Sequence, residues 1–371
     1  MSENMNYAAR QQALEAFDFG GRILDSVRFG NGHINETFCV TVEHGDHTTG
    51  RFVLQRINEN VFKKPKEVME NIESVTSYLR ERIREAGGDE SRETLRVLRT
   101  KSGDTLFKDS SGGYWRCYPY VEDTFCLQQV ENPELFYQAA RSFGNFLYLL
   151  KDYDASTLHE TIPRFDDTPH RYRNFRRALK ADLFGRAQSA KEEIDFVIGH
   201  RKDCAKLFDL LEAGELPLRV THNDTKLNNI LFDEKTGMAI CIVDLDTIMP
   251  GLSLSDYGDA IRFGATTAAE DEPDLSKVHF DLSLYELYTK GYLEGTNGAL
   301  TPLERECLPW GAKILTLECG IRFLTDYLQG DTYFRIRYPE HNLVRARTQF
   351  KLVADMEQRW EEMYAALHRY C

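Results

Sequence analysis

The stretch THNDTKLNNILF, residues 221–232, sets a run of polar residues between two apolar runs and constrains the fold more than any other segment. Asp224 opens the polar loop, and Asn229 follows five residues later, where the next strand is expected to begin. Downstream, AICIVDLDTIMPG reads as a second strand that ends in Asp244 and Asp246. The pattern predicts interrupted strand pairing, with Asp224 and Asn229 pointing into a cleft.

The spacing of these residues matches the needs of phosphoryl transfer. That reaction requires a carboxylate to position the attacking hydroxyl and hard oxygen ligands to hold magnesium. An Asp–x4–Asn pair followed by a strand-end aspartate supplies them, as in the catalytic loop of protein kinases. We assign Asp224 as the base, Asn229 and Asp244 as metal ligands with Asp246 as an extra ligand, and Lys226 as a charge-neutralising group. The alternative is that Asp224 and Asn229 only cap turns.

The order of the expected elements divides the chain into two lobes, which predicts an α+β fold. Strands are expected at 38–42, 52–57, 95–99 and 114–118, with helices at 4–17 and 65–86. Helices are then expected at 133–151, 170–186, 190–213, 276–294, 303–329 and 342–369. We expect a β-rich nucleotide-binding lobe over residues 1–119 and a mainly helical lobe for catalysis and substrate binding over 120–371.

A glycine-bearing turn in FGNGHINETF is the first candidate for phosphate binding. Gly30 and Gly32 would let backbone N–H groups approach phosphates closely, and Asn35 follows them before the strand begins. The full G-x-G-x-x-G pattern is absent. A plain hairpin turn explains the same residues, so the position of the turn ahead of a catalytic loop carries the nucleotide interpretation.

The next strand, RFVLQRIN, departs from the protein-kinase pattern because it has no lysine for the α- and β-phosphates. Gln55 and Arg56 stand there instead, and strand alternation sends them to opposite faces without deciding which one faces the cleft. Glu70 or Glu73 on the following helix would be the partner, unless both lie on a solvated face. In RCYPYVE, Tyr118 and Tyr120 would form the hinge beside adenine, with an ordinary linker as the alternative.

Composition narrows the possible partners and surroundings. The formal net charge is −13, from 59 acidic against 46 basic residues, which argues against a general nucleic-acid binder. Eight cysteines form no CxxC pair, and reduced thiols fit a cytoplasmic protein. The N-terminal stretch lacks the pattern of a signal peptide, and no apolar run is long enough to span a membrane. We expect a cytoplasmic monomer.

The strings THNDTKLNNILF and CIVDLDTIMPGLSLSDYGDAIRFG resemble the aminoglycoside phosphotransferase/choline kinase-like superfamily, which has a protein-kinase-like fold. Within it, HNDTKLNN, the DLDT segment ahead of MPG, and LECGIRFLTDYLQGD are most similar to bacterial N-acetylhexosamine 1-kinases. The resemblance runs from GNGHINETF to the final helix. It implies an ATP- and Mg²⁺-dependent kinase that phosphorylates the anomeric hydroxyl of N-acetylglucosamine or N-acetylgalactosamine.

The resemblance also names the sugar contacts. It implies that His33, Arg322 and Tyr333 contact the sugar, together with Asp224. Arg322 lies in an otherwise apolar helix, where an arginine needs a ligand or a partner, and Asp326 at i+4 is the structural alternative. Two other functions stay open. One is a kinase of an amino alcohol or aminoglycoside on the same fold, and the other is an inert nucleotide-binding scaffold.

Overall fold

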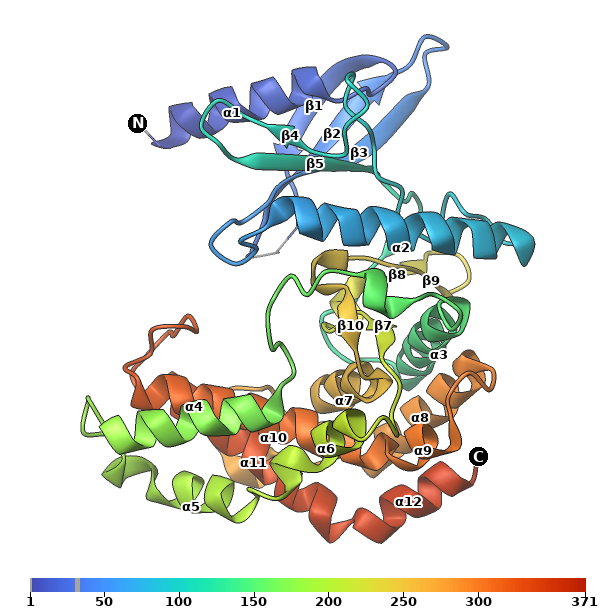
Figure 1. The fold of residues 1–371 in the computed structure, drawn as a ribbon. Coiled ribbons are helices and arrows are strands. Elements are labelled where there is room, and N and C mark those ends of the chain that lie inside the picture. Colours follow the sequence, from blue (N-terminus) through green and yellow to red (C-terminus); the bar gives the residue numbers. More distant parts are fainter. Residues whose placement is uncertain (1, 31–33) are drawn as a thin grey trace.

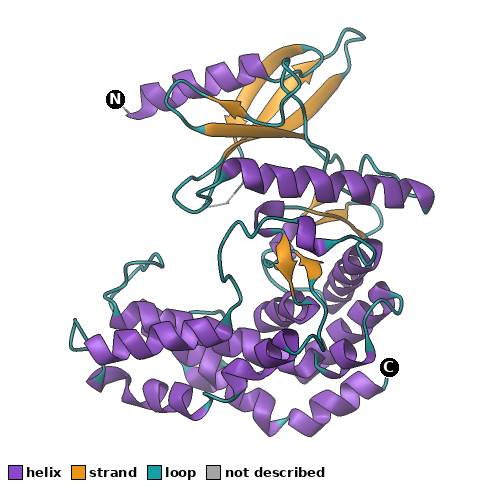
Figure 2. Ribbon diagram, viewed as in Figure 1, coloured by secondary structure: helices purple, strands orange, loops and turns teal. Residues whose placement is uncertain are grey.

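The computed structural model of the chain describes residues 2–30 and 34–371, and it has a β-rich N-terminal part above a mainly helical C-terminal part, as predicted (Figures 1 and 2). The helices are α1 (Ser2–Ala16), α2 (Pro65–Glu85), α3 (Pro133–Leu149), α4 (Thr168–Ala181), α5 (Lys191–Gly199), α6 (Lys206–Glu212), α7 (Ser253–Gly264), α8 (Leu282–Thr296), α9 (Pro302–Glu306), α10 (Leu308–Leu328), α11 (His341–Gln358) and α12 (Trp360–His368). The strands are β1 (Arg22–Arg28), β2 (Glu36–Glu43), β3 (Thr49–Arg56), β4 (Phe107–Lys108), β5 (Tyr114–Pro119), β6 (Thr124–Phe125), β7 (Arg219–Thr221), β8 (Ile230–Asp233), β9 (Ala239–Ile242) and β10 (Met249–Gly251).

An antiparallel sheet with the order β1-β2-β3-β5-β4 forms the N-terminal part. Helix α1 covers one face, where Ala13 and Phe17 pack on Val40, Leu54 and other buried residues of the sheet. The register places Gln55 of β3 opposite both Thr37 of β2 and Arg116 of β5. These three side chains therefore share one face of the sheet, the face away from α1.

Helix α2 lies between the sheet and the helical part of the molecule (Figure 1). Pro65 stands in its first turn, and Val68, Met69, Ile72, Val75 and Leu79 form a buried stripe at helical spacing. The buried Asn71 fixes the helix from below, because its Nδ2 donates to the backbone oxygens of His159 at 2.8 Å and Ile248 at 2.9 Å. The helix thereby links the N-terminal sheet to the loops of the C-terminal part.

The C-terminal part is built around α10, which packs against α4, α7 and α11, while α3 packs against α8. Two small antiparallel sheets stand on this base, β7 with β10 and β6-β8-β9. The loop between β7 and β8 and the loop after β9 carry the predicted catalytic and metal residues. Among the helices of residues 2–30 and 34–371, none is long and apolar enough to cross a membrane.

Several predicted elements differ in detail. Residues 95–99 form no strand; Leu98 donates one backbone hydrogen bond to Cys117 at 2.8 Å, and the segment then turns to meet Phe17 at Thr100. Three segments that were each predicted as one helix form two helices in the structure. They are 190–213 (α5 and α6), 303–329 (α9 and α10) and 342–369 (α11 and α12). The break at Cys307 has the clearest cause, because Pro309 has no N–H to continue the preceding helix and instead opens α10.

Candidate active site

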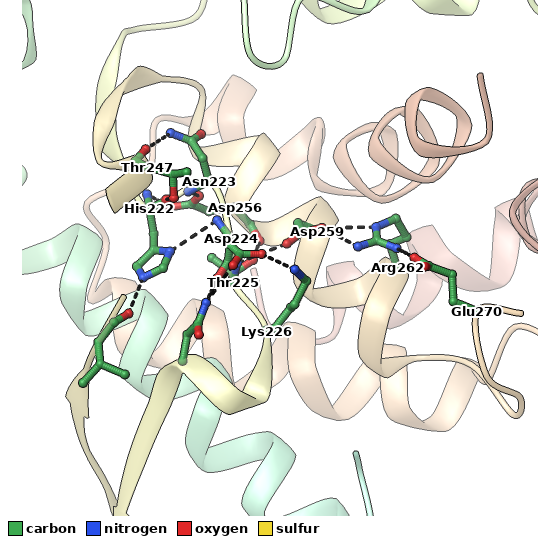
Figure 3. A network of polar contacts seen from close by, with 12 residues as sticks. His222, Asn223, Asp224, Thr225, Lys226, Thr247, Asp256, Asp259, Arg262 and Glu270 are labelled. Carbon is green, nitrogen blue, oxygen red and sulfur yellow. Dashed lines mark hydrogen bonds and ion pairs between the residues drawn. The ribbon is translucent and has the colours of Figure 1, made fainter. Parts of the chain in front are cut away.

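The loop between β7 and β8 is held from below by two aspartates of α7 (Figure 3). The Asp256 carboxylate accepts the backbone N–H of His222 at 2.8 Å and of Asn223 at 2.7 Å. Asp259 accepts the N–H of Thr225 at 3.1 Å. Asn223 has a φ of 63°, which asparagine tolerates better than most residues. Asp256 and Asp259 therefore fix the backbone of the loop.

Histidine 222 connects this loop to the strand that leads to Asp244. Its Nδ1 accepts the backbone N–H of Asp224 at 3.3 Å, and its Nε2 lies 2.9 Å from the backbone oxygen of Val243. These contacts fit the tautomer that carries its proton on Nε2. The ring is fully buried and packs against Phe143 and Phe146, so the two loops are held at a fixed separation.

The predicted base, cation and metal ligand are in direct contact. Asp224 Oδ1 lies 2.5 Å from Lys226 Nζ, and its Oδ2 accepts from Asn229 Nδ2 at 3.0 Å. Burial disfavours the charged carboxylate, but the Lys226 charge and these hydrogen bonds outweigh it and hold the pKa of Asp224 below its ordinary value. Asp224 therefore stays ionised at neutral pH.

Asp244 meets the requirements of a metal ligand. It follows β9 with a φ of 60°, and no donor within residues 2–30 and 34–371 hydrogen-bonds its carboxylate. Desolvation and the nearby charges of Asp246 and Asp224 raise the pKa of Asp244 above the ordinary range of a carboxyl. Asn229 directs its nitrogen to Asp224, which leaves its amide oxygen for another partner. Two oxygen donors on facing loops fit Mg²⁺.

Asp246 is engaged by residues from the N-terminal part. Its Oδ1 forms a buried ion pair with Arg116 of β5, and its Oδ2 accepts from Asn35 Nδ2 at 2.6 Å. Gln55 accepts from Arg116 Nε at 2.9 Å and donates to Thr37 at 3.1 Å. Gln55 therefore faces the site. Metal ligation by Asp246 stays a prediction.

The other predicted nucleotide residues are placed as follows. Arg56 lies on the far face of β3, where it contacts Ser111 at 3.1 Å and Asp109 at 3.7 Å. Gly30 follows β1, two residues after its last residue, with a φ of 77°, whereas Gly32 and His33 lie outside the described residues. Tyr118 is buried at the end of β5, and Tyr120 lies beside the ring of Phe29, at a centroid distance of 5.7 Å.

Arg322 is placed between two aromatic rings rather than in an ion pair. Its guanidinium lies 5.9 Å from the Phe165 ring centroid and 5.5 Å from that of Phe334, and no carboxylate in the described ranges comes within ion-pair distance. The expected alternative partner, Asp326, accepts the backbone N–H groups of Thr332, Tyr333 and Phe334 at 2.8–2.9 Å. Tyr333 is exposed, at 74% of its surface.

Two cavities flank this arginine. One, of about 570 Å³, is lined by Arg322, Tyr333 and Phe334 together with residues of α4. The other, of about 440 Å³, is lined by Phe165, Asp166, Ser255 and, from the catalytic loop, Asn223. Both volumes fall in the range of small-molecule sites. Arg322 lines the first cavity, and Phe165, whose ring centroid lies 5.9 Å from the Arg322 guanidinium, lines the second.

Sequence reasoning missed Arg116, Asp166 and Glu318. The absence of a lysine in β3 could have pointed to Arg116, because it implies that another residue supplies the positive charge. Burial and the Glu318 charge raise the pKa of Asp166 to about 8. Glu318 itself accepts from Thr168 at 2.6 Å and lies 3.6 Å from Arg171. Asp166 lies on a segment without a motif, and Glu318 lies within LECGIRFLTDYLQGD, so only the fold brings the two acids together.

Comparisons with known proteins agree with the two-part fold. The chain is similar along most of its length to an amicoumacin kinase solved with AMP-PNP and Ca²⁺, at 11% identity and a TM-score of 0.56, covering 97% of this chain and 96% of that one. It is similar to a choline kinase from Cryptosporidium parvum, at 14% identity and a TM-score of 0.55 over 93% of this chain and 92% of that one. An aminoglycoside phosphotransferase from Alicyclobacillus acidocaldarius gives 13% identity and a TM-score of 0.58 over 95% and 96%.

These structures show only the kinase-like fold, because sequence identities of 11–14% carry no information about the substrate. The assignment to a family rests on the sequence itself. The model of the phosphotransferase enzyme family APH matches residues 25–291, from β1 to α8, a span that contains the catalytic loop and Asp244. The chain therefore belongs to the APH phosphotransferase family.

Proposed function

We propose that this protein transfers the γ-phosphoryl group of ATP to the anomeric hydroxyl of a 2-acetamido sugar and releases a sugar 1-phosphate. The observation that carries the phosphotransfer is the contact of Asp224 with Lys226 and Asn229. Family membership supports a small-molecule kinase in general. The sugar acceptor rests on the resemblance of HNDTKLNN and LECGIRFLTDYLQGD to the hexosamine kinases.

Asp224 would accept the proton of the sugar hydroxyl. An anomeric hydroxyl is more acidic than an ordinary alcohol, so a carboxylate of low basicity can serve as its base. The lowered pKa of Asp224 is consistent with that substrate, because the base need only orient and deprotonate an acidic group. Lys226 keeps Asp224 ionised and adds positive charge beside the attacking oxygen.

Asn229 and Asp244 would hold the divalent ion through their side-chain oxygens. When bound, Mg²⁺ neutralises phosphate charge and orients the phosphates for in-line transfer. The buried His222 contributes by keeping the loop of Asn229 and the loop of Asp244 at a fixed separation. Gly30 and Asn35 on the phosphate side, and Tyr118 and Tyr120 at the hinge, stay predicted nucleotide contacts, as does Gly32, which lies outside the described residues. His33, also outside the described residues, stays a predicted sugar contact.

Arg322 is the candidate that would recognise the sugar. A guanidinium held between Phe165 and Phe334, with Tyr333 nearby, offers both donors for hydroxyl or acetamido oxygens and apolar surface for a ring face. Its charge disfavours a cationic acceptor. We place the sugar between this residue and Asp224, in the cavity that Phe165 and Asn223 line.

The main rival is a kinase of a cationic amino alcohol or aminoglycoside, and Asp166 and Glu318 are the observation in its favour. Two carboxyl groups near the acceptor cavity would attract an ammonium group. However, the raised pKa of Asp166, about 8, favours its neutral form at pH 7, and Glu318 already interacts with Thr168 and Arg171. Asp166 is better suited to hydrogen-bond a neutral sugar.

An acceptor panel tests the proposal. Purified protein with MgATP is given N-acetylglucosamine, N-acetylgalactosamine, choline, homoserine or kanamycin, and ADP release is measured. We expect ADP release with the acetamido sugars only. ADP release with choline or kanamycin alone would establish the rival, and no release with any acceptor, despite ATP binding, would favour an inert scaffold.

A further inference from the structure

The cation–carboxylate pair that holds the α- and β-phosphates in protein kinases has no counterpart at its usual place in this chain. There a lysine on the third strand pairs with a glutamate on the following helix. Here Gln55 takes the cleft-facing position on β3. Glu70 of α2 contacts His159 at 2.7 Å, and Glu73 pairs with Arg99. Neither glutamate approaches Gln55.

Arg116 occupies the space that this pair would fill. It stands directly opposite Gln55 in the strand register, and its side chain is 1% exposed. Its Nε donates to Gln55 at 2.9 Å, and one terminal nitrogen lies 4.0 Å from the sulfur of Met69 on α2. Met69 thus occupies the inner face of α2, where a glutamate would otherwise stand, and Arg116 finds its carboxylate elsewhere.

That carboxylate belongs to Asp246, two residues after the predicted metal ligand Asp244. Both oxygens of Asp246 are used by the N-terminal part, since Arg116 takes one and Asn35 donates to the other at 2.6 Å. Asn35 also accepts the backbone N–H of Asn58 at 2.9 Å. Asp246 is therefore attached directly to two pieces of the opposite lobe, and through Asn35 to a third.

We propose that Arg116 and Asp246 take the place of the lysine–glutamate pair, so that β5 rather than β3 brings the positive charge to the phosphate side of the site. Asp246 is then the counter-ion that positions the loop of Asp244, and it is not a ligand of the metal. The proposal rests on the phosphotransfer function proposed above. It assigns Arg116 as a positioning residue that the sequence motifs do not contain.

Arginine suits this position physically. Its guanidinium keeps its charge even when buried, and its several donors can hold Gln55 and Asp246 together while still facing a phosphate. A buried ion pair with one partner removed leaves an uncompensated charge, so loss of either residue should weaken the contact between the two lobes. The pair also fixes where Asp244 stands before any nucleotide binds.

Nucleotide binding without any sugar tests the proposal. Fluorescent analogues give dissociation constants for ADP and for adenosine, with Mg²⁺ and in EDTA. Arg116→Met should raise the dissociation constant for ADP by about 10- to 100-fold in both conditions, the size expected for a lost charged hydrogen bond. The dissociation constant for adenosine should stay within about 3-fold of the native value. Arg116→Lys should recover part of the loss. Arg22→Met is the matched control, because its pair with Glu43 at 2.8 Å lies on the exposed far edge of the sheet.

A second variant tests the counter-ion role if Arg116→Met does not fold. Asp246→Asn, which only displaces Asp244, should raise the Mg²⁺ concentration at half-maximal ADP binding by about 10-fold, whereas Asp244→Asn, which alters the ligand itself, should raise it by more than about 100-fold. An equal loss in the two variants would overturn the counter-ion assignment.

If Arg116→Met weakens the binding of ADP and of adenosine equally, Arg116 has only a structural role. That result would overturn the inference and leave the proposed function intact. If the native protein binds neither ATP nor ADP, the proposed function and this inference both fail. Melting curves of each variant separate a loss of fold from a loss of phosphate affinity.

Discussion

Asp224 and Lys226 form an ion pair of 2.5 Å across a single intervening residue, and the same carboxylate accepts a hydrogen bond from Asn229. Sequence analysis assigns Lys226 as a charge-neutralising group, and in the structure its ammonium contacts Asp224. Burial disfavours the charged amine, but Asp224 and Asp259 together raise the pKa of Lys226 above its ordinary value. The pair is therefore charged on both sides before substrates bind.

Replacing the base tests the role of Asp224. Asp224→Asn removes the proton acceptor and keeps the shape, so kcat should fall by about 10³-fold, within the range of general base catalysis. MgADP affinity should stay near the native value. The matched control is Asp195→Asn, which alters an exposed aspartate that also lies 2.5 Å from a lysine, Lys191. Near-native turnover in Asp224→Asn would remove the base assignment.

Neutralising Lys226 should act on the chemical step. Lys226→Met should lower kcat by about 10²-fold, because positive charge beside the transferred group stabilises the transition state. Binding of MgADP should change little, since Asn229 and Asp244 stay in place. Lys191→Met on α5 is the control for loss of a surface ion pair. A rise in the KM for ATP with kcat unchanged would instead place Lys226 in ground-state nucleotide binding.

Asp256 gives a pH-dependent prediction. Burial raises its pKa from 3.8 to about 6, while the backbone N–H groups of His222 and Asn223 oppose the rise. Between these pH values the folded protein binds a proton that the unfolded chain has released, so this group's contribution to stability falls as pH rises. Asp256→Asn lacks this pH-dependent contribution, because an asparagine side chain does not titrate. The unfolding free energy of the native protein minus that of the variant should fall by on the order of 3 kcal/mol between pH 4 and 7.

Denaturant unfolding at several pH values measures this difference, and groups common to both proteins cancel. The slope should vanish above about pH 7, where Asp256 is ionised in both states. A difference that grows with pH would show that Asp256 is stabilised as a carboxylate and would contradict the raised pKa. Activity should fall as well, since an amide nitrogen cannot accept an N–H from the catalytic loop.

Arg322 should govern the acceptor alone. Arg322→Met keeps the apolar contact with Phe165 and Phe334 but removes the donors, so the acceptor KM should rise by about 10- to 100-fold, with the KM for ATP unchanged. Arg176→Met, on the exposed side of α4, controls for the loss of one positive charge. An unchanged acceptor KM would move the sugar away from this arginine.

The catalytic loop was predictable because its members are close in sequence. Asp224, Lys226 and Asn229 span six residues, and the short strands around them fix which side chains share a face. Asp244 could be added because a strand end after a hairpin returns to the same edge. The α2 helix was predicted almost to its ends, since Pro65 and a regular apolar stripe mark it.

The cross-lobe contacts were not predictable for the same reason. Arg116 and Asp246 are 130 positions apart, and strand alternation could not decide between Gln55 and Arg56 without the register of β3 and β5. Asp326 was the expected alternative partner of Arg322 at i+4. In the structure the loop of Thr332–Phe334 folds back, and its backbone N–H groups hydrogen-bond the Asp326 carboxylate instead. Helix spacing alone cannot foresee such a competitor.

The most direct measurement of the central claim is the position of the phosphate in the product. The protein is incubated with MgATP and N-acetylglucosamine or N-acetylgalactosamine, and the product is analysed by ³¹P NMR with correlation to sugar protons. We predict a single phosphomonoester whose phosphorus couples to the anomeric proton H1, and no such product from Asp224→Asn under the same conditions. Coupling to H6 or to another ring proton, or phosphorylation of choline or kanamycin in place of either sugar, would contradict the account.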